Sequence, residues 1–166
     1  MRKIGLLQTV LIVVLLFGCS HSDTGVVRQP INTQPLNGEV KTLQSWQGDY
    51  PVAQLNLLPE MQREQAVGFI TDAKAFRVVW KAFKPAEAVP EIDFTTNMVL
   101  FARNIQFYNR ISIAKVSVKD GVAEVLAMET LSAMPIEDRV AMSLVLVARD
   151  GISGLRVGNG IIKISD

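Results

Sequence analysis

The chain contains one cysteine and one histidine among its 166 residues, and this scarcity excludes several kinds of site. A single cysteine, Cys19, cannot close a disulfide within the chain, and it excludes a zinc site built from cysteines. We expect the single histidine, His21, to lie in an N-terminal tether, where it cannot be held in place as a general base. The Ser-His-Asp and Cys-His arrangements of hydrolases are therefore excluded, and stability must come from a packed core.

Runs of charge of one sign are also missing. The chain has 17 Lys and Arg against 16 Asp and Glu. Without Arg2 and Lys3, which lie in an expected leader over residues 1–18, 15 basic residues remain against 16 acidic ones, for a net charge of −1. A near-neutral chain without a basic run favours neither nucleic acid nor an acidic membrane surface as a partner. The acidic residues also lack the dense spacing of a calcium loop, so no metal site is expected.

Only one long apolar run is present, at residues 4–17, and it follows two basic residues. It is shorter than the roughly 20 residues that a membrane-spanning helix needs. Its length is typical of the apolar region of a secretory signal peptide. The sequence therefore predicts export from the cytoplasm.

The segment Leu16-Phe17-Gly18-Cys19, at the end of this run, resembles the lipobox of bacterial lipoproteins. The resemblance implies cleavage of residues 1–18, attachment of a diacylglycerol to Cys19 and acylation of the new N-terminus. Several acyl chains on one residue anchor a protein firmly, whereas one chain is marginal. Because Ser20 is not aspartate, the same analogy favours the outer membrane, with the domain facing the periplasm. A plain signal peptide with an incidental cysteine is the alternative.

Residues 19–48 are expected to form the lipidated cysteine and a flexible tether. The sequence from residue 20 to about residue 38 is mostly polar, contains prolines and shows no sustained periodicity. The remaining residues, 49–166, then form one domain, since this length suits a single core.

Within this domain, the spacing of apolar residues predicts one main helix and six or seven strands. Thr71 or Asp72 begins the helix, apolar residues follow at positions 73, 76, 79, 80 and 83, and Pro85 ends it. Strands are expected at 52–58, 65–70, 97–102, 108–118, 122–129 and 139–148, before a tail that closes with apolar residues at 161–164.

Two local signals refine this pattern. The phase of the apolar residues changes near residues 114–115, which indicates a bulge. The sequence Lys119-Asp120-Gly121 indicates a hairpin turn. Together the elements predict an α+β fold whose mainly antiparallel sheet is curled around the main helix or partly barrel-like.

The order of several segments resembles the C-terminal domain of PrcB-like protease-complex lipoproteins, over about residues 66–150. The resemblance depends on Phe69-Ile70-Thr71-Asp72, a helix with Phe76 and Trp80, then Ile92-Asp93-Phe94 and Asn97-Met98-Val99-Leu100. Where that family favours glycines, this chain has residues 103–110. The resemblance implies a non-catalytic module that holds or stabilises a partner protein.

A cluster of polar, aromatic and cationic residues between two predicted strands is the candidate site. If Ile105 and Phe107 point inward, the other residues of the segment point outward, and Arg and Tyr often anchor protein interfaces. An ordinary hairpin connection is the alternative. The candidate partner-binding residues are Arg103, Asn104, Gln106, Tyr108, Asn109 and Arg110.

We therefore expect a non-catalytic, lipid-anchored protein that binds another envelope protein and needs no cofactor. The first alternative is a carrier or sensor for an apolar ligand, which would need a cavity between helix and sheet. The second is a hydrolase that uses an acidic pair, Glu91 with Asp93 or Glu137 with Asp138. A hydrolase would need facing titratable groups with displaced pKa values.

Overall fold

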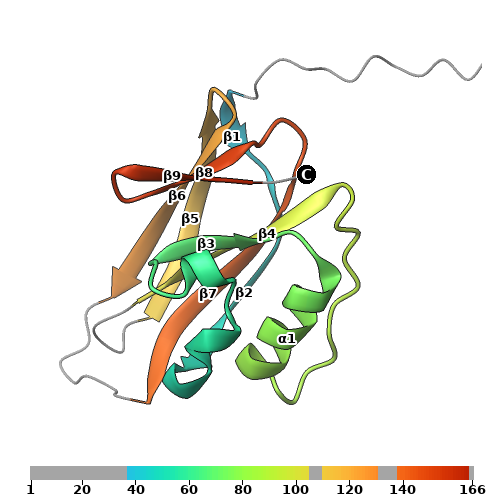
Figure 1. Cartoon of the computed structure of the whole chain (residues 1–166), viewed down its shortest axis with the longest axis vertical. Helices are drawn as coiled ribbons and strands as arrows, with labels where there is room; N and C mark the ends of the chain where they lie inside the picture. The colour runs from blue at the N-terminus through green and yellow to red at the C-terminus, as the bar shows by residue number, and fades with distance from the viewer. Residues whose placement is uncertain (1–36, 105–109, 131–137, 165–166) are drawn as a thin grey trace, which may run out of the picture. The chain divides into compact units, whose positions relative to one another are not determined.

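The computed structural model describes residues 37–104, 110–130 and 138–164, all of which belong to one compact unit (Figure 1). The described strands are β1 (Gly38–Val40), β2 (Thr42–Pro51), β3 (Val67–Ile70), β4 (Asn97–Arg103), β5 (Arg110–Lys119), β6 (Val122–Thr130), β7 (Arg139–Ala148), β8 (Gly154–Val157) and β9 (Gly160–Lys163). The described helices are α1 (Ala73–Phe83) and two 3-10 helices, η1 (Val52–Leu57) and η2 (Glu60–Gln62). The α+β class is confirmed.

The strands form two separate sheets. One has the order β1-β5-β6-β8-β9 and the other the order β2-β7-β4-β3. Neighbouring strands are antiparallel except β6 and β8, which pair in parallel. The expectation of one curled or partly barrel-like sheet is wrong, because the chain leaves the four-stranded sheet after β4 and returns to it only at β7.

The four-stranded sheet is covered on both faces. Along β4, Val99 and Phe101 join the core cluster that includes α1, whereas Met98 and Leu100 join the cluster shared with the five-stranded sheet. The alternation follows from the two-residue period of a strand. The described residues therefore form three layers, with helices on one side of the four-stranded sheet and the five-stranded sheet on the other.

Helix α1 confirms the prediction from apolar spacing. The Asp72 carboxylate accepts a hydrogen bond of 2.8 Å from the backbone N–H of Ala75, which caps the first turn. At the other end the Lys84 N–H donates to the carbonyl of Trp80 at 2.7 Å, and Pro85 follows. Phe76 and Trp80 are buried in the core, as their positions in the apolar pattern predict.

The strand expected at 52–58 is wrong, because η1 occupies most of this segment. Leu55 and Leu58 pack into the core on the helix side, whereas Val52 and Leu57 are exposed. A spacing of three between the inward residues matches the period of a 3-10 helix and not that of a strand.

Regular structure begins earlier than the expected domain boundary at residue 49. Residues 38–48, expected in the tether, form β1 and most of β2. Strand β2 is an edge strand whose residues before Trp46 are exposed and mostly polar, so the sequence carries little of the alternation that marks a half-buried strand. Its pairing with β7, about a hundred residues later, holds it in place.

Two local predictions are confirmed. The register between β5 and β6 shifts between Ile113 and Lys115, at the expected bulge. Asp120 and Gly121 join these strands with φ angles of 52° and 78°, as the Asp-Gly signal for a hairpin turn requires. None of the helices in the described part of the chain is long and apolar enough to cross a membrane.

Candidate functional site

Polar side chains gather at one end of the two sheets, where β2, β4 and β6 end and β5 and β7 begin. This polar end consists of Asp49, Arg103, Asn104, Arg110, Glu129, Asp138 and Arg139. Three of the six predicted partner-binding residues belong to it. The other three, Gln106, Tyr108 and Asn109, lie outside the described residues.

Arg103 does not point outward, which corrects the prediction. Its side chain is 2% exposed, because the alternation of β4 places it on the same face as Val99 and Phe101. Its Nη2 donates to the carbonyl of Arg63, and its backbone N–H donates to the carbonyl of Ala66 at 2.8 Å. In the sequence, the alternation that places Arg103 on the same strand face as Val99 and Phe101 is the signal that predicts the burial of its side chain.

The Arg103 guanidinium has few partners for a buried cation. Among the described residues, neither Nε nor Nη1 has a hydrogen-bond partner. Burial lowers the pKa of Arg103 from its usual value, and the nearby Glu64 carboxylate opposes this shift. An arginine nevertheless stays protonated in proteins, so the positive charge remains buried here.

Asn104 is also buried, which corrects the prediction that it points outward. Its side-chain amide donates to Glu129 Oε2 at 3.0 Å, and its backbone N–H donates to the carbonyl of Ala141 at 3.0 Å. Since Glu129 lies on β6 and Ala141 on β7, Asn104 joins the two sheets at the polar end. Its described contacts indicate a structural role.

Arg110 is exposed at the start of β5, as the prediction requires. Its backbone pairs with Thr130 of β6, whose hydroxyl donates to the Arg110 carbonyl at 3.4 Å. These contacts fix the backbone while leaving the guanidinium at the surface. Among the described candidates, Arg110 is therefore the one that is exposed.

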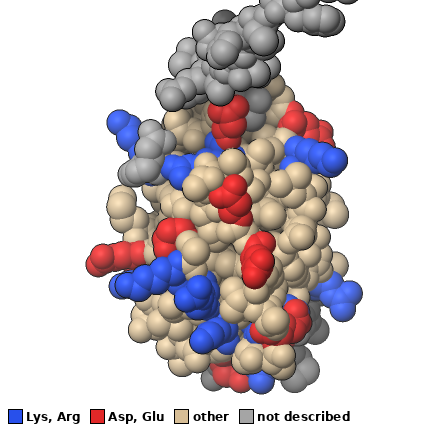
Figure 2. Space-filling view, turned by 90° about the vertical axis from the view of Figure 1, so that its right-hand side faces the viewer, with Lys and Arg blue, Asp and Glu red and all other residues tan. Residues whose placement is uncertain are grey.

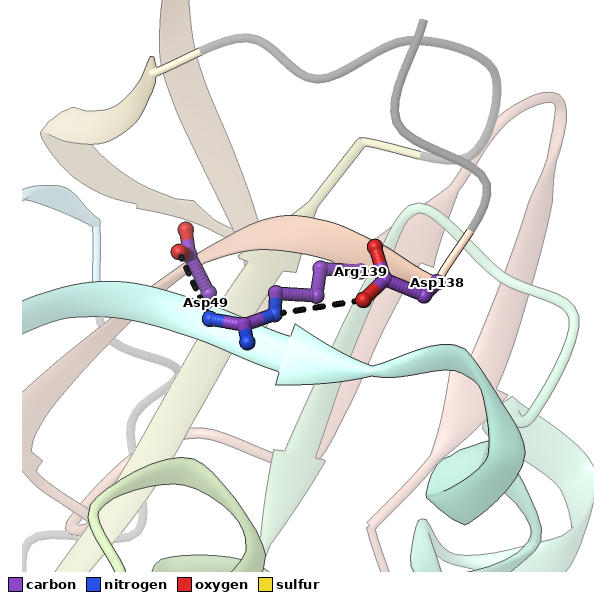
Figure 3. A network of polar contacts seen from close by, with 3 residues as sticks. All are labelled: Asp49, Asp138 and Arg139. Carbon is purple, nitrogen blue, oxygen red and sulfur yellow. Dashed lines mark ion pairs between the residues drawn. The ribbon is translucent and has the colours of Figure 1, made fainter.

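An ion-pair network at the start of β7 was not predicted from the sequence (Figure 3). Arg139 lies between two carboxylates, with Nη1 4.0 Å from Asp49 Oδ2 and Nε 3.5 Å from Asp138 Oδ2. The Arg139 side chain is 57% exposed, and exposed pairs of this kind stabilise a fold only weakly. The sequence could not show that Asp49 meets Arg139, because the two strands are far apart along the chain.

The acidic pairs considered for hydrolysis lie in different settings. The Asp93 carboxylate accepts hydrogen bonds from the Thr95 hydroxyl and N–H and from the Thr96 hydroxyl, and these bonds lower its pKa. The ionised Asp93 side chain therefore stabilises a turn at the surface. Glu137 lies outside the described residues. Within those residues, no group of three or more metal-ligating side chains is placed to hold a metal ion.

Aromatic rings occupy the space between α1 and the four-stranded sheet. The Trp46 ring lies 5.4 Å from Trp80 and 6.3 Å from Phe76, measured between centroids, and Phe76 lies 5.6 Å from Phe94. This is the place where the predicted alternative, a carrier, would hold its ligand. The ring contacts show that side chains pack this layer.

A comparison with known proteins found no matching family, no matching curated protein and no matching solved structure. Function is therefore inferred from the residues of this chain.

Proposed function

We propose that this chain is a lipid-anchored protein of the bacterial cell envelope whose folded domain binds a partner protein and carries out no catalysis. Anchoring is supported by the sequence Leu16-Phe17-Gly18-Cys19 after a short apolar run, which lies outside the described residues. The residue after the cysteine, Ser20, favours the outer membrane, with the domain facing the periplasm. The resemblance to PrcB-like lipoproteins supports the same kind of role.

The observation that carries the binding proposal is the exposed, mixed-charge surface at the polar end. Arg110 and Arg139 present guanidinium groups there, and Asp138 presents a carboxylate. Arginine is enriched among the residues that dominate binding energy at protein interfaces, because it combines charge with a planar, apolar surface. A partner with complementary carboxylates would fit this surface.

Protein binding is favoured over the carrier alternative by the packing of the helix layer. A carrier for apolar molecules needs a cavity of several hundred Å³, on the order of those that hold drug-sized ligands. The rings of Trp46, Phe76 and Trp80 contact one another in the layer where such a cavity would lie.

Lipidation is tested by labelling cells with a radioactive or clickable fatty acid. We expect the label on the wild-type chain and none on Cys19→Ser, together with mass spectrometry that finds a modified cysteine at the new N-terminus. Label that persists on Cys19→Ser, or a mature protein with an unmodified Cys19, would contradict anchoring.

Partner binding is tested by a photo-crosslinking amino acid placed at Arg110, in the anchored protein within its native envelope. Lys119, the exposed basic residue at the other end of β5, is the matched control position. We expect one protein to crosslink from position 110 and not from position 119. The crosslinked protein, once purified, should bind the double variant Arg110→Ala, Arg139→Ala at least about tenfold more weakly than the wild type. Equal crosslinking from both positions, or unchanged affinity, would argue against this surface.

A further inference from the structure

Three basic side chains form a stripe along the outer face of α1. Lys74, Arg77 and Lys81 are three and four residues apart, which places them within an arc of about 60° around the helix axis. All three are exposed, and none forms an ion pair within residues 37–104, 110–130 and 138–164. Helix α1 contains no acidic residue to balance them.

The stability of the helix explains only Lys81, which lies in the last turn, where the partial negative charge of the helix C-terminus favours a cation. Lys74 lies in the first turn, where the partial positive charge of the helix N-terminus disfavours a cation. Arg77 and Lys81 are four residues apart, so their like charges repel each other across one turn. Helix stability therefore accounts for Lys81 alone, and a negative partner would interact favourably with all three side chains.

Apolar side chains are exposed on the same layer. Val78 lies on α1 beside the basic residues, next to Lys74 and Lys81, and is 39% exposed. The neighbouring η1 contacts α1 and exposes Val52 and Leu57. Helices form the outer layer here, beyond the four-stranded sheet (Figure 1), so a flat surface could approach them.

Acidic side chains also occur on this side of the molecule, but they do not neutralise the stripe. Figure 2 shows one group of Lys and Arg at the lower left of this face, further Lys and Arg near its edges, and Asp and Glu between them. Glu87 is paired with Lys84 at 3.4 Å, just beyond the helix end. Glu60 and Glu64 lie at η2 and the turn after it, and Asp72 caps the helix two residues before Lys74.

We propose that the outer face of α1, together with η1, docks on a phospholipid bilayer that carries anionic headgroups. Basic side chains attract such headgroups, and exposed apolar side chains enter the interface beside them. An acidic protein would also match the charges, but the combination of Lys74, Arg77 and Lys81 with Val52, Leu57 and Val78 fits a bilayer better. The near-neutral composition of the whole chain does not reveal this feature, because these basic residues are concentrated on one helix.

The biological setting of this inference rests on the proposed anchoring at Cys19. A chain held at the bilayer experiences a high local concentration of lipid, so a weak docking surface can be occupied. Docking would hold the domain against the membrane with the helical layer facing the lipid. Vesicle binding itself does not require the acyl chains and can be measured without them.

The test uses the signal-cleaved chain with Cys19→Ser, which keeps every described residue and lacks the lipid. Its sedimentation is measured with vesicles of phosphatidylcholine plus phosphatidylglycerol and with vesicles of phosphatidylcholine alone. We expect binding only to the anionic vesicles, and loss of binding at high salt. The absence of binding to anionic vesicles at low salt would overturn the proposal.

A triple variant and its matched control distinguish the contribution of the stripe to vesicle binding from the contribution of net charge. Each basic residue near an anionic surface contributes about fivefold to partitioning, so Lys74→Gln, Arg77→Gln, Lys81→Gln together should lower it by roughly a hundredfold. The control triple, Lys41→Gln, Lys119→Gln, Lys163→Gln, removes the same charge from exposed sites away from α1 and should retain most of the binding. Equal losses in the two triples would overturn the proposal, as would unchanged binding of the helix triple.

Two further readouts distinguish this inference from the proposed function. The helix triple should still accept fatty-acid label at Cys19 and crosslink a partner from position 110. If it loses the crosslink and keeps vesicle binding, α1 serves a protein partner and the bilayer proposal is overturned. If labelling at Cys19 fails in the wild type while vesicle binding persists, anchoring is wrong and the docking surface stands.

Discussion

The backbone N–H of Ile113 donates a hydrogen bond of 3.3 Å to the hydroxyl of Ser143, and this bond ties the five-stranded sheet to the four-stranded one. Ile113 precedes the bulge in β5, at a point where β1 no longer pairs with that strand. The N–H therefore has no strand partner on that side among the described residues. Ser143, which is buried on β7, supplies the acceptor.

Replacing Ser143→Ala should lower the free energy of unfolding by about 1–3 kcal/mol, because the N–H of Ile113 loses its acceptor while the sheets stay packed around it. Urea unfolding of the two proteins measures the difference. Ser45→Ala, on the exposed part of β2, is the matched control and should change stability by less than about 0.5 kcal/mol. Equal effects of the two substitutions would refute the role of the bond.

Gly68 lies where β3 passes close to its neighbours. A Cβ at this position would overlap Gln62 Oε1 and the Phe101 ring. Gln62 Oε1 accepts a hydrogen bond of 2.5 Å from the N–H of Phe69, and so satisfies a donor on an edge strand. Any shift of Gln62 to make room would therefore break this bond.

We expect Gly68→Ala to destabilise the fold by about 1–3 kcal/mol, since the added methyl group must displace Gln62 or Phe101. Gly160→Ala is the comparison, because its Cβ would meet only the Val157 carbonyl at an ordinary 3.6 Å. It should cause no loss of stability. Thermal or urea unfolding checks both, and a tolerated Gly68→Ala would show that the close contact relaxes freely.

Local signals in the sequence predicted the local elements. The spacing of apolar residues and the cap at Asp72 predicted α1, and Asp120-Gly121 predicted the turn between β5 and β6. Both depend on interactions within a few residues of the chain. The division into two sheets depends instead on pairings between distant strands, such as β2 with β7, and local patterns do not encode these.

The candidate site was predicted only in part for a related reason. Arg110 is exposed as predicted, but Arg103 is buried, because the phase of β4 sets its direction and overrides the usual exposure of arginine. Arg139 joins the site through Asp49, a residue on another strand. Predicting that pair requires the register of β2 against β7, which follows from packing and not from either segment alone.

The buried guanidinium of Arg103 leads to an unusual expectation for a core substitution. Its Nε and Nη1 have no hydrogen-bond partner among the described residues, and Nη2 donates to the backbone carbonyl of Arg63. Methionine has a similar length and carries no charge to desolvate. Arg103→Met should therefore keep stability or raise it by about 1 kcal/mol, whereas Arg103→Ala should lower it by leaving a cavity. A loss of more than about 2 kcal/mol for Arg103→Met in urea unfolding would show that the charge is stabilised in the folded state.

Burial raises the pKa of Tyr50 to about 12, and its hydroxyl donates to the Gln54 carbonyl at 3.2 Å. The unfolded chain holds a tyrosine at its ordinary pKa of about 10, so the neutral side chain stabilises the fold fully below pH 10. This contribution is lost as the pH rises from about 10 through 12, by about 2–3 kcal/mol in all. Urea unfolding at a series of alkaline pH values should therefore show a steeper loss of stability in the wild type than in Tyr50→Phe.

The chain has two tyrosines, so ultraviolet titration of Tyr108→Phe reports the ionisation of Tyr50 alone. Ionisation of Tyr50 near pH 10 in the folded protein would contradict its burial.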